Sequence, residues 1–269
     1  MAIDEHTYAF RNARTAQRRR LETLETLLDE GTIRVLGARG VAPGARCLEV
    51  GAGGGSIARW LAGRVGRGGS VLATDIDTTV CADIAAPNVE VRAHDVLSDD
   101  LPEAEFDLVH MRLLLAWVAD PALALERLIV ALKPGGVLVA EEMDFVSVVP
   151  DPRVEPGARR AFEDFLTGHH ALLGARHAFD PFYGRQVAGD LRASGLVDVG
   201  CEGRAAMWRG GGPGGLAWRL SLEQLRDGLV AGGHVDPGAL DAAAAALDDP
   251  QFSFMSQITM AAWGRRPPA

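Results

Sequence analysis

Short apolar runs alternate with segments of helical hydrophobic spacing through the first half of the chain. The runs are brief and typical of strands, whereas the segments between them repeat apolar residues every three or four positions. We expect strands at 47–50, 71–75, 89–93, 106–110 and 137–140, and helices at 12–36, 56–65 and 121–132. Strands that alternate with helices predict an α/β fold, with a parallel sheet covered by helices on both faces.

The alternation weakens after residue 142, and helical patterns dominate the second half. A glycine-rich segment at 209–215 predicts a loop or a tight turn. We expect helices at 155–173, 183–193, 222–230 and 237–247, and strands at 197–201 and 252–263.

This change of pattern divides the chain into a core and additions to it. We expect a cofactor-binding core at 41–144, preceded by an N-terminal helical segment over the site at 1–40. Cap helices follow at 145–196, and terminal strands at 197–269 carry a helical insertion at 203–251. The expected whole is one structural domain with a helical cap.

Composition and charge exclude several classes of protein. The 269 residues are 48% hydrophobic and carry a formal net charge of -9, so a packed core is expected and a general nucleic-acid binder is not. No apolar run approaches the roughly 20 residues of a membrane helix, and the start has no apolar signal region. The three cysteines are widely spaced and odd in number, which favours a reducing, cytoplasmic compartment.

The residues that suggest chemistry begin with the segment from Glu49 to Ser56, which follows a strand and opens a helix. Glycines at 51, 53, 54 and 55 allow the backbone to approach a ligand closely. A dinucleotide site would place a third glycine where Ser56 stands, whereas an acid followed by G-x-G-x-G fits completely. No Gly-Lys-Ser/Thr follows, so a P-loop is excluded.

Three further features follow at strand ends. Asp75 ends the second expected strand, where a carboxylate can accept both hydroxyl protons of a ribose. Asp95 and Val96 follow the third strand, where an acid can accept from an adenine amino group and an apolar side chain can pack on its ring. Pro134 and Gly135 suit the central positions of a type II turn that leads into a strand.

Taken together, these features resemble the class I S-adenosylmethionine-dependent methyltransferases, of the small-molecule, ubiquinone/menaquinone-methylase-like kind. The resemblance covers residues 41–144 and rests on five segments in the family's order: LEVGAGGGS, VLATDID, AHDV, FDLVHMRLLLAWV and LKPGGVLVAEE. It implies a Rossmann-like seven-stranded sheet of order 3-2-1-4-5-7-6. Strand 7 would be antiparallel, and residues 252–263 would form it.

The resemblance also implies S-adenosyl-L-methionine as cofactor, S-adenosyl-L-homocysteine as product, and roles for particular residues. Gly51, Gly53 and Gly55 would lie along the methionine part of the cofactor, supported by Glu49. Asp75 would hold the ribose. The remaining cofactor contacts would come from Ile76, Asp95 and Val96 at the adenine and from the backbone near His110 at the amino-acid end.

Candidates for the acceptor side come from strand ends and from the second half of the chain. His110 is a candidate base, and Arg112 is a candidate contact for an acidic acceptor or for the cofactor carboxylate. His169 and Tyr183 are candidate acceptor contacts, with packing or solvated surface as the alternative for each. Acidic residues gather at 141–144, but the other ligands of a magnesium site are not recognisable, so no metal is predicted.

We therefore expect in-line transfer of a methyl group to an O, N or C nucleophile of a small molecule, secondary metabolites included. Neither nucleic acid nor membrane is an expected partner, and a homodimer is a candidate assembly. Two alternatives stay open. One is an NAD-type oxidoreductase on a Rossmann fold, and the other is a cofactor-binding protein of this fold that does not transfer methyl groups.

Overall fold

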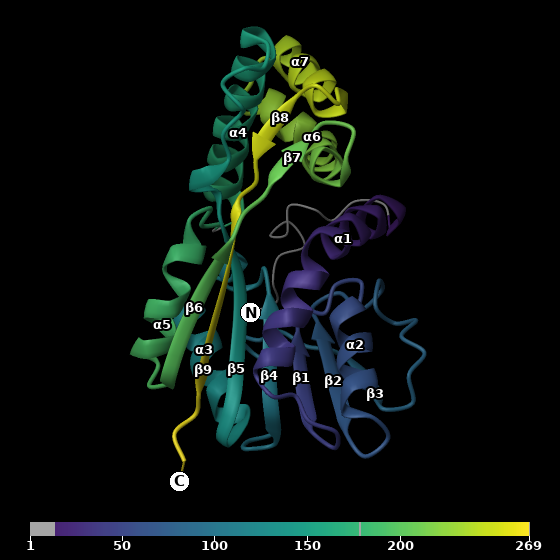
Figure 1. Cartoon of the computed structure of the whole chain (residues 1–269), viewed down its shortest axis with the longest axis vertical. Helices are drawn as coiled ribbons and strands as arrows, with labels where there is room; N and C mark the ends of the chain where they lie inside the picture. Colours follow the sequence, from purple (N-terminus) through teal and green to yellow (C-terminus); the bar gives the residue numbers. More distant parts are fainter. Residues whose placement is uncertain (1–13, 178, 269) are drawn as a thin grey trace. The chain divides into compact units, whose positions relative to one another are not determined.

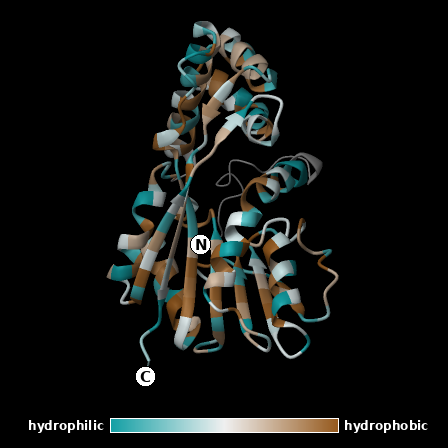
Figure 2. Ribbon diagram, in the orientation of Figure 1, coloured by the Kyte–Doolittle hydropathy of each residue, from teal (hydrophilic) through white to brown (hydrophobic). Residues whose placement is uncertain are grey.

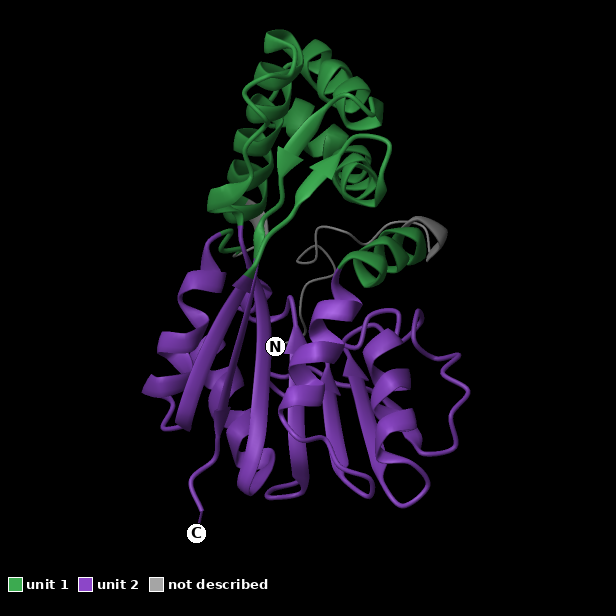
Figure 3. Cartoon of the chain, in the orientation of Figure 1, with its two compact units in different colours: residues 1–27, 145–181, 204–258 green, residues 28–144, 182–203, 259–269 purple. Residues whose placement is uncertain are grey.

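The computed structural model describes residues 14–177 and 179–268, and within them the chain forms two compact units. Unit 1 contains residues up to 27 together with 145–181 and 204–258, and unit 2 contains 28–144, 182–203 and 259 onward (Figure 3). Residues 12 and 13 of the first expected helix lie outside the described part. No helix among the described residues is both long enough and apolar enough to cross a membrane.

Unit 2 is built on the expected seven-stranded sheet, in the order β3-β2-β1-β4-β5-β9-β6 (Figure 1). The pairs β1–β2, β1–β4, β2–β3 and β4–β5 are parallel. The strands are β1 (Arg46–Val50), β2 (Ser70–Asp75), β3 (Val89–Ala93), β4 (Phe106–Arg112), β5 (Leu132–Asp144), β6 (Val197–Arg204) and β9 (Ile258–Arg265).

The strand β9, which is the last along the chain, runs antiparallel to its neighbour β5. The end of β9 pairs with the start of β5, because the Gly135 N–H donates to the Arg266 carbonyl and the Arg266 N–H donates to the Gly136 carbonyl, both at 2.9 Å. The strand order and the antiparallel strand confirm the fold predicted from the sequence.

Helices cover the sheet, and the central strands are buried on both faces. The second half of α1 (Arg14–Ala38) and α2 (Ser56–Val65) share one apolar cluster with side chains of β1, β2, β4 and β5. The other helical elements of this unit are η1 (Leu115–Trp117), α3 (Pro121–Ala131), η3 (Tyr183–Arg185) and α5 (Val187–Ala193). Figure 2 shows the apolar colouring along the strands, as expected for a largely parallel sheet.

Unit 1 is mainly helical and has a small sheet of its own. The antiparallel strands β7 (Met207–Arg209) and β8 (Ser253–Met255) pack with α4 (Pro156–His177), α6 (Pro213–Ala231) and α7 (Pro237–Asp248). The short helix η2 (Phe145–Ser147) begins the second segment of this unit, 145–181. Its core is aromatic, with Phe162, Phe165 and Phe254 completely buried.

Three expected elements are wrong in detail. The strand at 252–263 is interrupted at Ser256 and Gln257, so β8 pairs with β7 in unit 1 and β9 joins the sheet of unit 2. The helix at 183–193 is a 3₁₀ turn followed by α5. The helix at 222–230 begins earlier, at Pro213, and takes in Gly214, where a Cβ would lie 2.3 Å from the Trp208 ring. Close packing therefore explains that glycine better than loop flexibility does.

Candidate functional site

The glycine loop lies where β1 ends and α2 begins, at the carboxyl edge of the parallel strands. Gly51, Gly53 and Gly55 all have positive φ values, of 70°, 53° and 80°, which side chains with a Cβ rarely adopt. A Cβ on Gly55 would lie 2.5 Å from Ile84 Cδ1, whereas one on Gly51 would meet only the Leu114 side chain, at 3.5 Å and beyond. The glycines are therefore required by the backbone path, and the backbone at Gly51 is accessible to a ligand.

Asp75, at the end of β2, braces this loop. Its Oδ2 accepts the N–H of Gly53 at 2.9 Å, and its Oδ1 accepts the N–H of Asp77 at 3.0 Å. Burial raises the pKa of the Asp75 carboxyl, although the backbone hydrogen bonds act in the opposite direction. A carboxylate offers about four lone-pair positions, so both oxygens retain capacity for a further donor such as a hydroxyl group.

The other residues assigned to adenine differ in exposure. Ile76 is 45% exposed at the end of β2, so its apolar side chain is open to a ligand. Asp95 uses Oδ1 to accept the Leu97 N–H at 2.9 Å, and Oδ2 has no partner among the described residues. Val96 is only 5% exposed and packs in the protein's own core, which leaves little of its surface for a ring.

His110 lies in the middle of a buried charged cluster on the central strands. Its Nδ1 is 2.6 Å from Glu49 Oε2 and its Nε2 is 3.5 Å from Glu141 Oε2, and all three side chains are almost entirely buried. Burial alone would lower the pKa of His110, but the two carboxylates raise it to about 9. The ring is therefore a cation at neutral pH. Its Nδ1–H is directed at Glu49, and its Nε2 is in ion-pair distance of Glu141 without a hydrogen bond to any described residue.

The cluster continues into α1 through Arg112. Thr32 donates a short hydrogen bond to Glu141, and Arg112 donates to Thr32 Oγ1 and to Asp29 Oδ1, both at 2.9 Å. Asp29 Oδ1 also accepts from Ser56 Oγ, the first residue of α2, at 3.1 Å. Arg112 thus joins the second half of α1 to the strand edge next to the glycine loop.

Glu142 fixes the turn that follows β4. Its Oε1 accepts the backbone N–H groups of Leu114 and Leu115, at 2.9 and 2.6 Å, and Leu113 has a positive φ of 57°. Glu142 Oε2 is buried and has no hydrogen-bond partner among the described residues. Burial raises the pKa of this carboxyl to about 8, so it is largely protonated at pH 7. Because Leu114 adjoins Gly51, Glu142 holds one wall of the glycine loop.

The other carboxylates and Tyr183 have internal partners. Asp144 accepts from the Arg185 guanidinium at 2.5 and 2.7 Å, and the Tyr183 hydroxyl donates to Asp190 at 2.7 Å. Tyr183 is 4% exposed. Within residues 14–177 and 179–268, no group of three or more His, Cys, Asp or Glu side chains is arranged to hold a metal ion.

His169 belongs to unit 1, whereas the other candidates belong to unit 2. It is 4% exposed within an aromatic cluster, with its ring centroid 5.2 Å from Trp218 and 5.4 Å from His170. Burial lowers the pKa of His169 well below its usual value, and that of His170 to about 4. Both rings are therefore neutral at pH 7.

The structure thus brings Glu49, the three glycines, Asp75 and His110 to one edge of the sheet in unit 2. Sequence reasoning missed the roles of Asp29, Thr32 and Glu142. One signal was present for Thr32: it stands between Leu28 and Leu36 on a face with helical apolar spacing, and it is completely buried. A polar residue at a core position of this kind often has a buried partner.

Comparisons with known proteins agree with this geometry. Residues 48–140 match the family model described as a methyltransferase domain. The chain is 31% identical over 150 residues to the methyltransferase str2 of Strobilurus tenacellus, a match that covers 55% of this chain and 52% of the relative. The chain therefore spans about half the length of the curated relatives that it matches.

Solved structures show the same fold at low identity. The YcgJ protein of Bacillus subtilis has a TM-score of 0.57 at 15% identity, covering 89% of this chain and all of that one. Phosphoethanolamine N-methyltransferase 2 of Haemonchus contortus, in complex with phosphomonomethylethanolamine and S-adenosylhomocysteine, has a TM-score of 0.51 at 16% identity, covering 93% and 52%.

The sheet order, the glycine loop with its acid at position 49, and the domain match at 48–140 agree with one another. The ubiquinone/menaquinone-methylase-like subgroup stays a prediction. Residues 48–140 of the chain match a methyltransferase domain, on the seven-stranded fold that the sequence predicts.

Proposed function

We propose that this protein transfers a methyl group from S-adenosyl-L-methionine to a small-molecule acceptor. The observation that carries the proposal is the glycine loop, in which Gly51, Gly53 and Gly55 have positive φ values and Asp75 braces the Gly53 N–H. The loop lies within the matched methyltransferase domain. An NAD-type oxidoreductase fits less well, because Ser56 stands where a dinucleotide site has its third glycine.

The residues at this edge suit the parts of the cofactor. The open backbone at Gly51 suits the methionine part, and the remaining lone pairs of Asp75 suit the ribose hydroxyls. Exposed Ile76 and the unpartnered Oδ2 of Asp95 suit the adenine ring and its amino group. Val96 contributes less, because it is buried in the core.

The bound cofactor would supply an activated methyl group on a sulfonium, with a good leaving group already in place. The chain's own residues then have to align the acceptor's O, N or C nucleophile and keep water out. Positioning of this kind lowers a barrier by as much as ~7–11 kcal/mol. A general base is needed only for an acceptor that arrives protonated.

His110 supports a positioning role better than the role of a base. It is completely buried, and its two ring nitrogens face Glu49 and Glu141. With a pKa raised to about 9 by these carboxylates, against the effect of burial, it has no free lone pair for an acceptor proton at neutral pH. We propose that His110 holds Glu49 under the glycine loop.

We further propose that segments outside residues 41–144 select the acceptor. His169, Arg112 and Tyr183 are weak candidates for direct contact. His169 is 4% exposed within the aromatic cluster of unit 1, Arg112 binds Asp29 and Thr32, and the Tyr183 hydroxyl binds Asp190. The proposed acceptor is a small molecule, methylated at an O, N or C atom.

The test is cofactor binding followed by turnover. Isotopically labelled S-adenosylmethionine should be retained by the purified protein, and a panel of phenols, amines and carboxylates should include an acceptor that releases S-adenosylhomocysteine. Retention of NADH without S-adenosylmethionine would overturn the assignment of the loop. Cofactor binding without turnover on a broad panel would favour a protein of this fold that does not transfer methyl groups.

A variant pair ties binding to the loop. Gly53→Arg places a long side chain at a left-handed position inside the loop and should abolish cofactor binding. Gly195→Arg is the matched control, because its φ of 84° carries similar strain and a Cβ there meets nothing within 4 Å. Undiminished cofactor affinity in Gly53→Arg would contradict the proposal, and equal loss in both variants would point to misfolding.

A further inference from the structure

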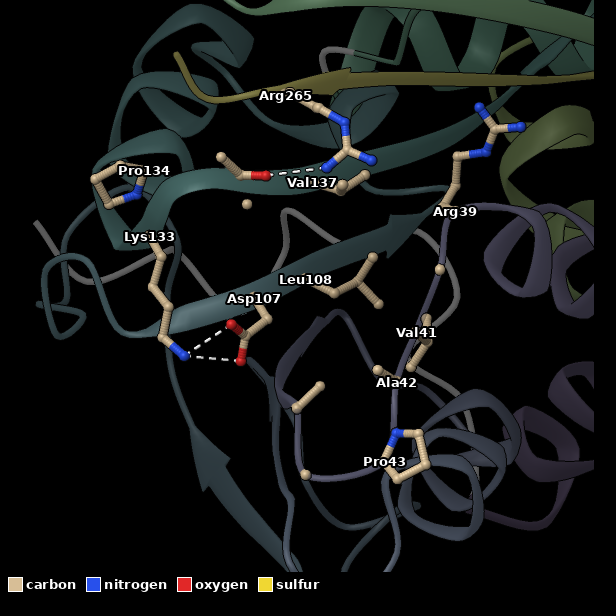
Figure 4. Close-up of a pocket in the computed structure, with 15 residues that line it drawn as sticks. Arg39, Val41, Ala42, Pro43, Asp107, Leu108, Lys133, Pro134, Val137 and Arg265 are labelled. Carbon is tan, nitrogen blue, oxygen red and sulfur yellow. Dashed lines mark hydrogen bonds and ion pairs between the residues drawn. The ribbon is translucent and has the colours of Figure 1, made fainter. Parts of the chain in front are cut away.

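A pocket lies in unit 2 at the amino edge of the parallel strands, the edge opposite to the glycine loop. Its volume is about 580 Å³, and it is lined by the turn after α1, the starts of β4 and β5, and the end of β9 (Figure 4). Small-molecule sites in proteins usually have volumes of roughly 300–1,000 Å³. The pocket is therefore large enough for a metabolite, and the residues assigned to the cofactor do not line it.

The charges that line this pocket do not cancel. Lys133 is paired with Asp107, at 2.8 Å to both carboxylate oxygens. Arg39 and Arg265 also line the pocket, and neither has a carboxylate partner in the part of the chain that the structure describes. The lining thus carries two uncompensated positive charges in a protein whose formal net charge is -9.

The two arginines are held in place without acids. The Arg39 guanidinium lies over the Trp263 ring, 4.1 Å from its centroid, and Arg265 Nη1 donates to the Gly135 carbonyl at 3.0 Å. Arg39 Nε is buried and has no hydrogen-bond partner among residues 14–177 and 179–268. Stacking and one carbonyl fix the positions of both groups while most of their N–H donors stay available.

The carbonyl groups near the helix ends at this edge are already bound by other arginines, so they do not require the N–H donors of Arg39 and Arg265. Arg266 donates to the carbonyls of Val130 and Leu132 at the end of α3, and Arg64 donates to the Val41 carbonyl. Those side chains account for exposed carbonyl groups at this edge. Among the described residues the Arg39 side chain donates to no carbonyl, so the stack on Trp263 fixes its orientation and leaves its N–H donors without an acceptor.

We propose that this pocket binds a small molecule with a phosphate or carboxylate group, through the guanidinium groups of Arg39 and Arg265. A planar guanidinium forms paired hydrogen bonds with such oxyanions, which a lysine cannot do. Figure 4 shows the two arginine side chains on one side of the pocket and the Lys133–Asp107 pair on the other. Asp107 would repel the anion from its own side and leave the arginine side as the binding surface.

Binding can be measured by calorimetry on the full chain, with pyrophosphate and citrate as separate probes. Pyrophosphate tests for binding of a phosphate group, and citrate tests for binding of a carboxylate group. We expect saturable binding of at least one probe that weakens as salt is added, because the contact is largely ionic. Absence of binding by both probes at millimolar concentration would overturn the proposal.

Variants locate the site. Arg39→Gln and Arg265→Gln should each lower the affinity about tenfold or more, since a hydrogen bond to a charged group is lost. Arg92→Gln, which removes an exposed arginine paired with Glu90 in the same unit, should leave the affinity unchanged. Thermal unfolding checks that the variants are folded. Unchanged affinity in the Arg39→Gln, Arg265→Gln double variant would place the anion elsewhere and refute the proposal.

Discussion

His110 Nδ1 lies 2.6 Å from Glu49 Oε2, and both side chains are buried next to the glycine loop. His110 is on β4 and Glu49 is on β1, and Glu141 on β5 faces the other ring nitrogen at 3.5 Å. One imidazolium therefore links the three central strands through charge. Buried charges are tolerated only when they are paired, so the stability of this edge depends on all three groups.

We expect His110→Gln to destabilise the protein by about 3–5 kcal/mol, because it leaves two carboxylates buried without a cation. Urea unfolding followed by circular dichroism measures the change. His234→Gln is the control, since no carboxylate within residues 14–177 and 179–268 pairs with His234, and the substitution should lower the unfolding free energy by less than about 1 kcal/mol. An equally small change in both variants would show that the cluster contributes little.

The same histidine predicts a loss of stability at alkaline pH. Burial lowers the pKa of His110, but the carboxylates of Glu49 and Glu141 raise it to about 9 in the folded state. Because the pKa of His110 is higher in the folded state, its protonation stabilises the folded state fully at pH values below about 6.5, its pKa in the unfolded chain. This stabilisation is lost as the pH rises through 9. We expect on the order of 2–3 kcal/mol of loss over this range. The difference in unfolding free energy between wild type and His110→Gln should shrink over the same pH range, and a constant difference would contradict the assignment.

Glu142 predicts a pH dependence that a conservative substitution removes. Burial raises the pKa of this carboxyl to about 8, so its folded state holds a proton that the unfolded state releases above about 4.5. The unfolding free energy should therefore fall by about 4 kcal/mol as the pH rises from 4.5 to 8.

Glu142→Gln keeps an acceptor oxygen for the N–H groups of Leu114 and Leu115 and does not titrate. We expect the variant to match wild type near pH 5 and to be the more stable protein at pH 8, by thermal unfolding. Glu90→Gln, at an exposed position, is the control and should preserve the wild-type pH profile. A variant that is less stable than wild type at both pH values would show that Glu142 acts as a charged acceptor.

The sequence predicts the sheet and the glycine loop because their signals are local. Strand runs, glycine spacing and the acid at position 49 are each written within a few residues. The buried cluster is different, since Thr32 and Glu141 are 109 positions apart and meet only when α1 packs on the sheet. Local patterns also fail at Gly214, because its neighbour Trp208 approaches only in the folded unit. Pairings of this kind depend on tertiary structure. The sequence shows that Thr32 is a polar residue on an apolar helix face, but it does not show which residue is its partner.

Two glycines near α2 make a matched pair for the loop. At Gly55 the φ of 80° and the 2.5 Å approach of Ile84 Cδ1 predict that Gly55→Ala destabilises by about 1–3 kcal/mol and weakens cofactor binding. Gly63 lies in the same helix, is exposed and has nothing within 4 Å of an added Cβ. Gly63→Ala should therefore stabilise by about 0.5–1 kcal/mol. Chemical unfolding compares the two, and a stabilising Gly55→Ala would refute the backbone argument.

The neutral histidines of unit 1 predict sensitivity to acid. Burial lowers the pKa of His170 to about 4 and that of His169 well below its usual value, so the unfolded chain gains protons below about 6.5 while the folded unit does not. Stability of unit 1 should therefore fall between pH 6.5 and 4, and His170 alone should account for about 1–2 kcal/mol of the loss at pH 5. Hydrogen exchange in peptides from α4 reports on this unit directly. His169→Phe should keep the aromatic contacts with Trp218 and reduce the acid sensitivity. If acidification accelerates hydrogen exchange in α4 equally in His169→Phe and in wild type, protonation of His169 is not the cause of the acid sensitivity.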